Sequence, residues 1–381
     1  MKRFLTPCLT VLALAVMAAR PGSAHELTLP PSGDNQHSEV SQRIGLVNVE
    51  ITYNSPNVHA PDGTDRKGKI WGELVPYGLA NLGFGTCGDQ CPWRGGSNEN
   101  TTFAVDHDVV VQGKPLPAGT YGLHFIPGKE EWTIVFSHNS TAWGSFFYDV
   151  KEDALRVTAK PVESAYREFL TYEFVDREPA KATVELEWEN LALPWTIEVP
   201  NVNELYAEKI REELQNFQGF SWQNWERAAN FCLTNKVNLA EGLTWAQAAV
   251  DGSFGGQANF TTLSTLAALQ EANGQAAESA KTLELAINHP AASAFDIHNA
   301  GRQLLAAKKT ALGIKVLETN GKRFPGVWPT EVSLGRASAA AGKKADALRH
   351  FKAAMATAPD DPAKKNLENL IAKVEKGEAI D

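Results

Sequence analysis

The chain has 381 residues, of which 43% are hydrophobic and 21% charged, and its formal net charge is −9 at pH 7. This composition is typical of a folded protein with about two domains, and it excludes a disordered chain. Because the chain is acidic and its Lys and Arg residues do not cluster, we expect it to bind neither nucleic acid nor an anionic membrane surface.

The first residues have the pattern of a secretory signal peptide. Lys2 and Arg3 precede an apolar run at positions 9–19, and small residues suitable for cleavage follow at positions 22–24. The run is too short to span a bilayer as a stable helix. We therefore expect segment 1–24 to be a cleaved signal peptide, and the mature protein to be periplasmic or secreted with no membrane span.

Three cysteines follow this segment. Cys87 and Cys91 share a Gly-rich loop, and in the oxidising compartment that export implies they are predicted to form a local disulfide. Zinc binding is the alternative, but no second closely spaced pair of Cys or His completes a four-ligand set. Cys232 is interpreted as a small buried apolar residue. We expect no metal and no cofactor.

The N-terminal half of the chain alternates apolar and polar residues, as strands with one buried and one solvated face do. The alternation is clear at 47–53 and at 184–189, where three Glu residues are assigned to a solvated face. Segments 121–125 and 132–136 are expected to pair as a hairpin around the turn 127–130. About ten such strands, separated by turn residues, predict an antiparallel β-sandwich or jelly-roll-like module.

Near Asn201 the apolar period becomes that of a helix, and Ala and Leu replace β-branched residues. We therefore place the β module at 38–200 and a helical module at 203–381. The helical module contains a 34-residue repeat in which a proline ends each unit. The equivalent positions are Gly274, Lys308 and Gly342; Leu283, Leu317 and Phe351; Ala267, Gly301 and Gly335; and Pro290, Pro325 and Pro359.

This repeat resembles the tetratricopeptide repeat, in which small residues let two helices approach and large apolar residues fill the groove between units. An earlier degenerate unit is expected around 240–250, and a capping helix around 367–374. The α-helical array is therefore predicted to be tetratricopeptide-like, and a chance helical bundle is the alternative. Such arrays present a concave surface to a protein partner, so we expect one. Packing of the array against the β module is the alternative role.

Three stretches of the β module resemble a bacterial family known as domain-of-unknown-function family 2911. They are Ile70-Trp71-Gly72-Glu73-Leu74-Val75-Pro76-Tyr77-Gly78, then Trp93-Arg94-Gly95-Gly96-Ser97-Asn98-Glu99-Asn100-Thr101-Thr102, and the hairpin that begins at Leu116. The resemblance covers about 41–199 and implies the extent of the domain but no activity. The sequence departs from the family's usual spacing at 79–92, an insertion that carries both loop cysteines.

A polar cluster within this resemblance is the candidate ligand-binding site. Trp93, Arg94, Asn98, Glu99 and Asn100 place an aromatic ring, a guanidinium, two amides and a carboxylate in one short segment among glycines. Arg and Glu orient hydrogen bonds, and Trp stacks on a sugar or peptide face. The alternative is structural: Glu99 pairs with Arg94 or caps loop amides, while Trp93 packs in the core.

Four histidines, His59, His107, His124 and His138, lie in the same module. If two or three of them converged, they would form a metal site or an acid–base pair. None has a close ligand spacing, so surface or hydrogen-bonded roles are the alternative. The sequence contains no nucleophile elbow, phosphate-binding loop or dinucleotide fingerprint.

The favoured hypothesis is an exported, non-catalytic binding or scaffold protein of the bacterial cell envelope. Its β module would bind a polar or carbohydrate-like ligand, or a protein, and its helical repeats would recruit a partner. An envelope hydrolase that uses Glu99 with a nearby histidine is the alternative, and a purely structural envelope protein is a third hypothesis. Convergence of Glu99, Arg94 and a histidine in one pocket would favour the hydrolase.

Overall fold

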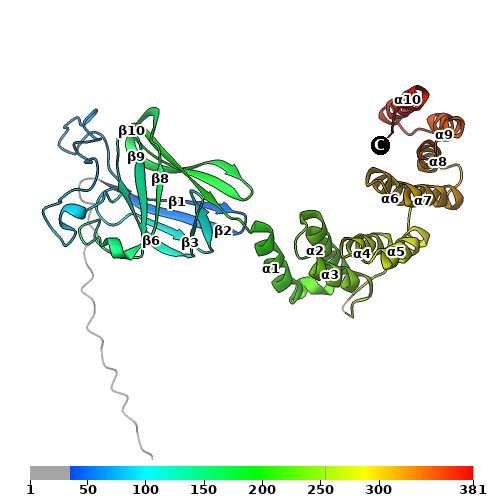
Figure 1. Ribbon diagram of the computed structural model, residues 1–381, viewed down its shortest axis with the longest axis horizontal. Coiled ribbons are helices and arrows are strands. Elements are labelled where there is room, and N and C mark those ends of the chain that lie inside the picture. The colour runs from blue at the N-terminus through cyan, green and yellow to red at the C-terminus, as the bar shows by residue number, and fades with distance from the viewer. Residues whose placement is uncertain (1–34, 254, 381) are drawn as a thin grey trace, which may run out of the picture. The chain divides into compact units, whose positions relative to one another are not determined.

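The computed structural model of the protein describes residues 35–253 and 255–380 (Figure 1). These residues divide between Pro200 and Asn201 into two compact units, a β module and a helical module. The predicted signal peptide lies outside the described residues. Within them, no helix combines the length and the apolar character that crossing a membrane requires.

Two antiparallel sheets contain the ten strands found among the described residues of the β module. Six strands form the larger sheet in the order β1-β2-β3-β6-β7-β8, and four form the smaller sheet in the order β5-β4-β10-β9. This confirms the predicted antiparallel β fold. The bounds are β1 Gln36–Ile44, β2 Val47–Ser55, β3 Thr102–Val105, β4 Val109–Val111, β5 Lys114–Leu116, β6 Gly119–Ile126, β7 Trp132–Ser137, β8 Asp153–Ala159, β9 Val162–Glu178 and β10 Lys181–Glu198.

The predicted hairpin is confirmed as β6 and β7. Leu123 pairs with Phe136, and Phe125 pairs with Ile134, on either side of the turn 127–130. All four side chains are fully buried. Large aliphatic and aromatic side chains of this kind favour the pleated surface of a sheet, which explains why the alternation identified the hairpin.

Aromatic rings join the two sheets into one core. The Tyr53 ring of β2 lies 4.8 Å from the Tyr172 ring of β9, measured between centroids. The Phe125 ring of β6 lies 5.9 Å from the Trp195 ring of β10. Because each pair joins the larger sheet to the smaller one, the sheets pack face to face as a sandwich.

The Glu residues of β10 do not share one solvated face, so that prediction was wrong. Glu187 is 9% exposed and forms an ion pair with Arg167 of β9 at 2.6 Å. Glu189 is 7% exposed, and its carboxylate accepts a hydrogen bond from the backbone N–H of Gly68. Periodicity does not reveal this burial, because the covering groups come from other parts of the chain.

A long connection between β2 and β3, residues 56–101, carries the candidate ligand-binding segment. Ile70 and Val75 are buried and fix the connection to the core. Ala80 and Cys91 exchange backbone hydrogen bonds of 3.0 and 3.1 Å, which close the insertion into a loop. The connection is therefore an integral part of the β module.

The described residues of the helical module form ten α-helices. Consecutive helices pair as α2 with α3, α4 with α5, α6 with α7 and α8 with α9. Helix α3 packs on α4 and α7 packs on α8, whereas the pair α4–α5 contacts the pair α6–α7 through far fewer residues (Figure 1). The bounds are α1 Val202–Leu214, α2 Trp222–Asn235, α3 Leu239–Asp251, α4 Phe260–Ala272, α5 Ala276–Asn288, α6 Ala294–Ala306, α7 Thr310–Arg323, α8 Trp328–Ala340, α9 Lys344–Ala356 and α10 Asp361–Lys376.

Equivalent contacts in successive helix pairs confirm the 34-residue repeat. Gly301 of α6 packs against the Leu317 side chain of α7, and Gly335 of α8 packs against the Phe351 ring of α9. A Cβ atom on Gly335 would lie 2.5 Å from Cε1 of Phe351, which is closer than real contacts allow. The small residues of the repeat therefore set how closely paired helices approach.

The turn inside each repeat requires a left-handed backbone. Gly274, Lys308 and Gly342 occupy equivalent turns and have φ angles of +79°, +60° and +74°. Glycine adopts this conformation at little cost, whereas a residue with a Cβ is strained there. Lys308 is therefore the departure from the pattern. After the last pair, α10 covers Phe351 with Leu367, as predicted for a capping helix.

Candidate ligand pocket of the β module

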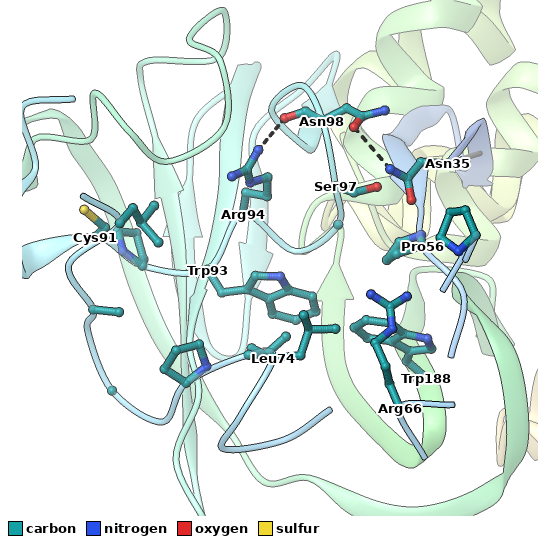
Figure 2. A pocket seen from close by; sticks show the side chains of 18 residues that line it. Asn35, Pro56, Arg66, Leu74, Cys91, Trp93, Arg94, Ser97, Asn98 and Trp188 are labelled. Atoms are coloured by element: carbon teal, nitrogen blue, oxygen red, sulfur yellow. Dashed lines mark hydrogen bonds between the residues drawn. The ribbon is translucent and has the colours of Figure 1, made fainter. Parts of the chain in front are cut away.

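A pocket of about 390 Å³ opens beside the candidate segment (Figure 2). Three of the five candidate residues, Trp93, Arg94 and Asn98, line it. The remaining lining residues come from Asn35, from the 56–101 connection and from β10. They are Asn35, Pro56, Pro61, Arg66, Leu74, Val75, Pro76, Gly78, Ala80, Leu82, Cys91, Pro92, Gly96, Ser97 and Trp188.

Trp93 belongs both to the core and to the pocket wall. Its backbone exchanges two hydrogen bonds of 2.7 Å with Phe125 of β6, which holds it against the larger sheet. Its half-buried indole lies 5.7 Å from the Trp71 ring, 6.1 Å from Trp132 and 6.3 Å from Trp188. Trp93 therefore has both of the roles that the sequence left open, because one side of its ring packs in the core and the other lines the pocket.

Two of the pocket residues that the sequence did not indicate as part of the site are Trp188 and Arg66. Trp188 of β10 is buried and its ring plane lies at 14° to that of Trp93, but the alternation of β10 identified it only as a core residue. Arg66 lies in the 56–101 connection, where no pattern distinguished it. Its Nε and Nη2 atoms donate hydrogen bonds of 3.1 and 2.5 Å to the carbonyls of Val58 and Asn57.

Arg94 is held rigidly at the pocket wall. Its Nη1 donates a hydrogen bond of 2.6 Å to the Asn98 carbonyl, and its guanidinium carbon lies 4.9 Å from the centre of the Phe146 ring. Gly144 gives it room, because a Cβ atom there would lie 2.6 Å from the guanidinium carbon. Burial lowers the pKa of Arg94, but a guanidinium remains protonated at neutral pH.

Asn98 links the pocket wall to the start of the described chain. Its Oδ1 accepts a hydrogen bond of 3.2 Å from Nδ2 of Asn35, and both residues line the pocket. Asn98 has a φ of +56°, a conformation that Asn tolerates better than most residues because its short polar side chain bonds locally. Figure 2 shows the hydrogen bonds of Asn98 with Arg94 and Asn35 above the Trp93 indole.

Glu99 and Asn100, the other two candidates, do not line the pocket. Glu99 is exposed, and its Oε2 accepts a hydrogen bond of 2.8 Å from Nδ2 of Asn54. Asn100 is buried and donates a hydrogen bond of 3.0 Å to the Asn139 carbonyl. Of these two adjacent residues, one is therefore exposed to solvent and the other is buried. Within the described residues Arg94 forms no ion pair with Glu99.

His124 is buried behind the pocket wall. Its Nδ1 lies 2.9 Å from the Ser145 hydroxyl, and its side chain is 2% exposed. Burial, and then the positive charge of Arg94, lower the pKa of His124 to about 3, so its ring is neutral at pH 7. His124 is therefore a hydrogen-bonded core residue.

The other histidines lie apart on the surface. His59 contacts Glu168 at 3.0 Å, His107 contacts Asp106 at 2.9 Å, and His138 is exposed. In the part of the chain that the structure describes, no group of three or more His, Cys, Asp or Glu residues is arranged to hold a metal ion. No histidine lines the pocket. The convergence that the hydrolase hypothesis required is thus not found among the described residues.

The insertion at 79–92 shapes the pocket. Cys87 and Cys91 form a disulfide that packs against Val135 and Tyr148, and the insertion also supplies Leu82 to the pocket lining. The departure from the family's usual spacing therefore forms part of the wall. Cys232, in contrast, is a buried free thiol in α2, as the sequence indicated.

The helical module has a smaller hollow on α6. It measures about 330 Å³ and is lined by Asn299, Arg302, Gln303 and Ala306. Arg302 and Gln303 are exposed. This hollow offers hydrogen-bond donors and one positive charge on the face of a single repeat.

Comparisons with known proteins agree with the resemblance stated above. Residues 35–197 match the model of a family described as "Protein of unknown function (DUF2911)". Among solved structures, a tetratricopeptide repeat protein from Parabacteroides merdae is 13% identical, with 46% of this chain and 68% of that chain covered and a TM-score of 0.31. The pilF protein of Pseudomonas aeruginosa is 14% identical, with coverages of 42% and 78% and a TM-score of 0.28. None of the curated proteins matches this sequence.

Proposed function

We propose that this chain, a β domain of unknown function joined to tetratricopeptide-like repeats, is an exported binding protein of the bacterial cell envelope. The β module binds a small polar or carbohydrate-like ligand in the pocket at Trp93. The helical module recruits a protein partner, as stacked helical repeats commonly do. Neither role requires a reaction.

The pocket itself is the observation that carries the proposal. Its volume of about 390 Å³ lies within the range of small-molecule sites, and it combines apolar walls with a few converging polar groups. Trp93 offers a flat ring for stacking, and the polar residues Ser97 and Asn98 belong to the same lining. The sheet fixes Trp93 through its backbone, so the site is largely formed before a ligand arrives.

Native mass spectrometry of the protein purified from a bacterial periplasm tests the pocket. We expect an added small-molecule mass on the wild-type protein. Leu74→Trp places a large ring at a pocket-lining residue that is 46% exposed, so the added mass should disappear. Val162→Trp, on an exposed position of β9 outside the pocket, is the matched control and should retain it. A wild-type protein without added mass contradicts the proposal.

Co-purification tests the helical module. Arg302→Glu reverses the charge in the α6 hollow and should weaken recovery of the partner protein. Lys322→Glu, an exposed change of the same charge on α7, is the control and should leave recovery unchanged. Equal recovery with both variants would place the partner surface elsewhere on the chain.

N-terminal sequencing tests export. The secreted or periplasmic protein should begin at His25, directly after the small residues at 22–24. Recovery of the protein from the cytoplasm with Met1 retained would contradict export.

A further inference from the structure

The charges that line the pocket have one sign. Of its 18 lining residues, Arg66 and Arg94 are cationic, and none is Asp, Glu, Lys or His. The whole chain carries a formal net charge of −9. The pocket lining, with two positive groups and no carboxylate, therefore has a charge opposite in sign to that of the chain. A concave site lined by charge of one sign concentrates ligands of the opposite sign.

Neither guanidinium forms a direct ion pair with a carboxylate of the described residues, although Arg66 is near enough to Asp62 to help lower the pKa of that carboxyl. Arg94 donates one hydrogen bond, to the Asn98 carbonyl, and Arg66 donates two, to the carbonyls of Asn57 and Val58. A guanidinium has five N–H donors, so both groups retain donor capacity. Their carbonyl contacts fix each side chain in place, which reduces the ordering cost of binding an anion.

An apolar surface lies between the two cations. In Figure 2 the Trp93 indole occupies the centre of the pocket, with Arg94 on one side and Arg66 beside Trp188 on the other. Leu74 adds a partly exposed aliphatic surface to the same lining. The Trp93 and Trp188 ring centroids are 6.3 Å apart, too close to admit a third ring between them, so a ligand lies against this surface.

We propose that the pocket selects a ligand in which a carboxylate is attached to an apolar or ring-shaped body. The carboxylate accepts hydrogen bonds from the guanidinium of Arg66 or of Arg94, the second guanidinium adds electrostatic attraction from the other side of the indole, and the body packs on Trp93 and Leu74. An acidic sugar and an N-acylated amino acid share this chemistry. This inference rests on the proposed ligand-binding function and specifies the class of ligand.

Calorimetric titration with two matched pairs of probes tests the inference. N-acetylmuramic acid is compared with N-acetylglucosamine, and N-acetylphenylalanine with its amide, so that each pair differs in a carboxylate. We expect the acid of at least one pair to bind about tenfold more tightly than its neutral counterpart, and raised salt to reduce that difference. The pair that shows the difference identifies the source of the carboxylate.

Arginine variants locate the charge. Arg66→Gln and Arg94→Gln should both weaken binding of the acid, about tenfold for the guanidinium that contacts the carboxylate and less for the other, and should change binding of the neutral probe little. Arg177→Gln, an exposed change on β9 outside the pocket, should have no effect. If a glutamine variant lowers thermal stability, Arg66→Lys and Arg94→Lys retain the charge and should retain the preference for the acid.

The outcomes separate this inference from the proposed function. If the neutral probes bind as tightly as the acids, and Leu74→Trp abolishes both, the pocket binds ligands but the anionic class is wrong. If the acids bind equally well to the Arg66→Gln, Arg94→Gln and wild-type proteins, the assignment of the two guanidinium groups is wrong. If no probe binds and the purified protein carries no added mass, both proposals fail.

Discussion

The residues that pack together in the two cores are separated by different distances along the sequence. In the β module, the Ser55 hydroxyl donates to the Leu170 carbonyl, and the Trp71 and Trp132 rings from separate segments lie 5.1 Å apart. In the helical module, each helix packs mainly on its neighbours in sequence (Figure 1). A destabilising core substitution should therefore affect the whole β module, whereas in the array its effect should be confined to the neighbouring repeats.

Trp132→Ala is expected to give the largest effect and to act on the whole β module. Trp132 is fully buried and its ring contacts both Trp71 and Trp93. The change should therefore lower the free energy of unfolding of the β module by about 4 kcal/mol. Ligand binding should be lost together with this stability. Thermal unfolding followed by circular dichroism measures it. Trp143→Ala, at a residue that is 48% exposed, is the control and should change stability little.

Phe351→Ala is expected to act on the last repeats alone. The ring is fully buried between α8, α9 and α10, so its loss should cost about 3 kcal/mol locally. Hydrogen exchange should accelerate in α8–α10 and remain unchanged in α2–α5. Phe295→Ala, at a residue that is 53% exposed, should leave all helices protected. Uniformly accelerated exchange across the array would refute local behaviour.

Acid is expected to destabilise both modules through one buried histidine in each. Burial and Arg94 lower the pKa of His124 to about 3, and burial with Arg336 and Arg302 lowers that of His298 to about 4. An unfolded histidine titrates near pH ~6.5, so below that pH the unfolded chain binds a proton that the folded chain refuses. Stability is full above pH ~6.5 and falls toward the folded pKa.

Denaturant unfolding at pH 7 and pH 5 measures this loss, which should be about 2 kcal/mol for each histidine. His124→Gln should flatten the pH dependence of the β module and leave that of the array unchanged. His298→Gln should do the reverse. An unaltered pH dependence in both variants would show that other groups control the acid response.

Lys308→Gly is expected to give the smallest effect, and it should stabilise the array. Lys308 has a φ of +60° where the equivalent turns have glycine, so the change should relieve about 1 kcal/mol of strain. Lys308→Ala removes the charge but keeps the Cβ atom, so it should not stabilise. Thermal unfolding of the helical module distinguishes the two variants.

The sequence predicted the array more completely than the pocket, for a physical reason. A repeat places every important contact at a fixed offset, so the packing of Gly335 on Phe351 follows from spacing alone. The hairpin of β6 and β7 was predictable in the same way, because its contacts are local. Contacts at a fixed or short separation along the chain can therefore be predicted from a single sequence.

The pocket depends on contacts between distant segments. Trp93, Arg94 and Asn98 were identified because they are adjacent to one another, but Arg66 and Trp188 reach the site through the tertiary fold. The same limitation explains two Glu residues of β10, because Glu187 pairs with Arg167 of β9 and Glu189 accepts a hydrogen bond from Gly68 of the 56–101 connection. Neither alternation nor residue type contains that information.

The tryptophan cluster has an optical consequence. Trp71, Trp93, Trp132 and Trp188 form ring contacts with centroids between 5.1 and 6.3 Å apart. The electronic transitions of indole rings at such separations couple to one another. The sign and intensity of the resulting near-ultraviolet circular dichroism depend on the angles between the rings. Because Trp93 also faces the pocket, a bound molecule that tilts its ring alters the coupled signal of all four. The unlabelled protein can thus report its own occupancy in real time.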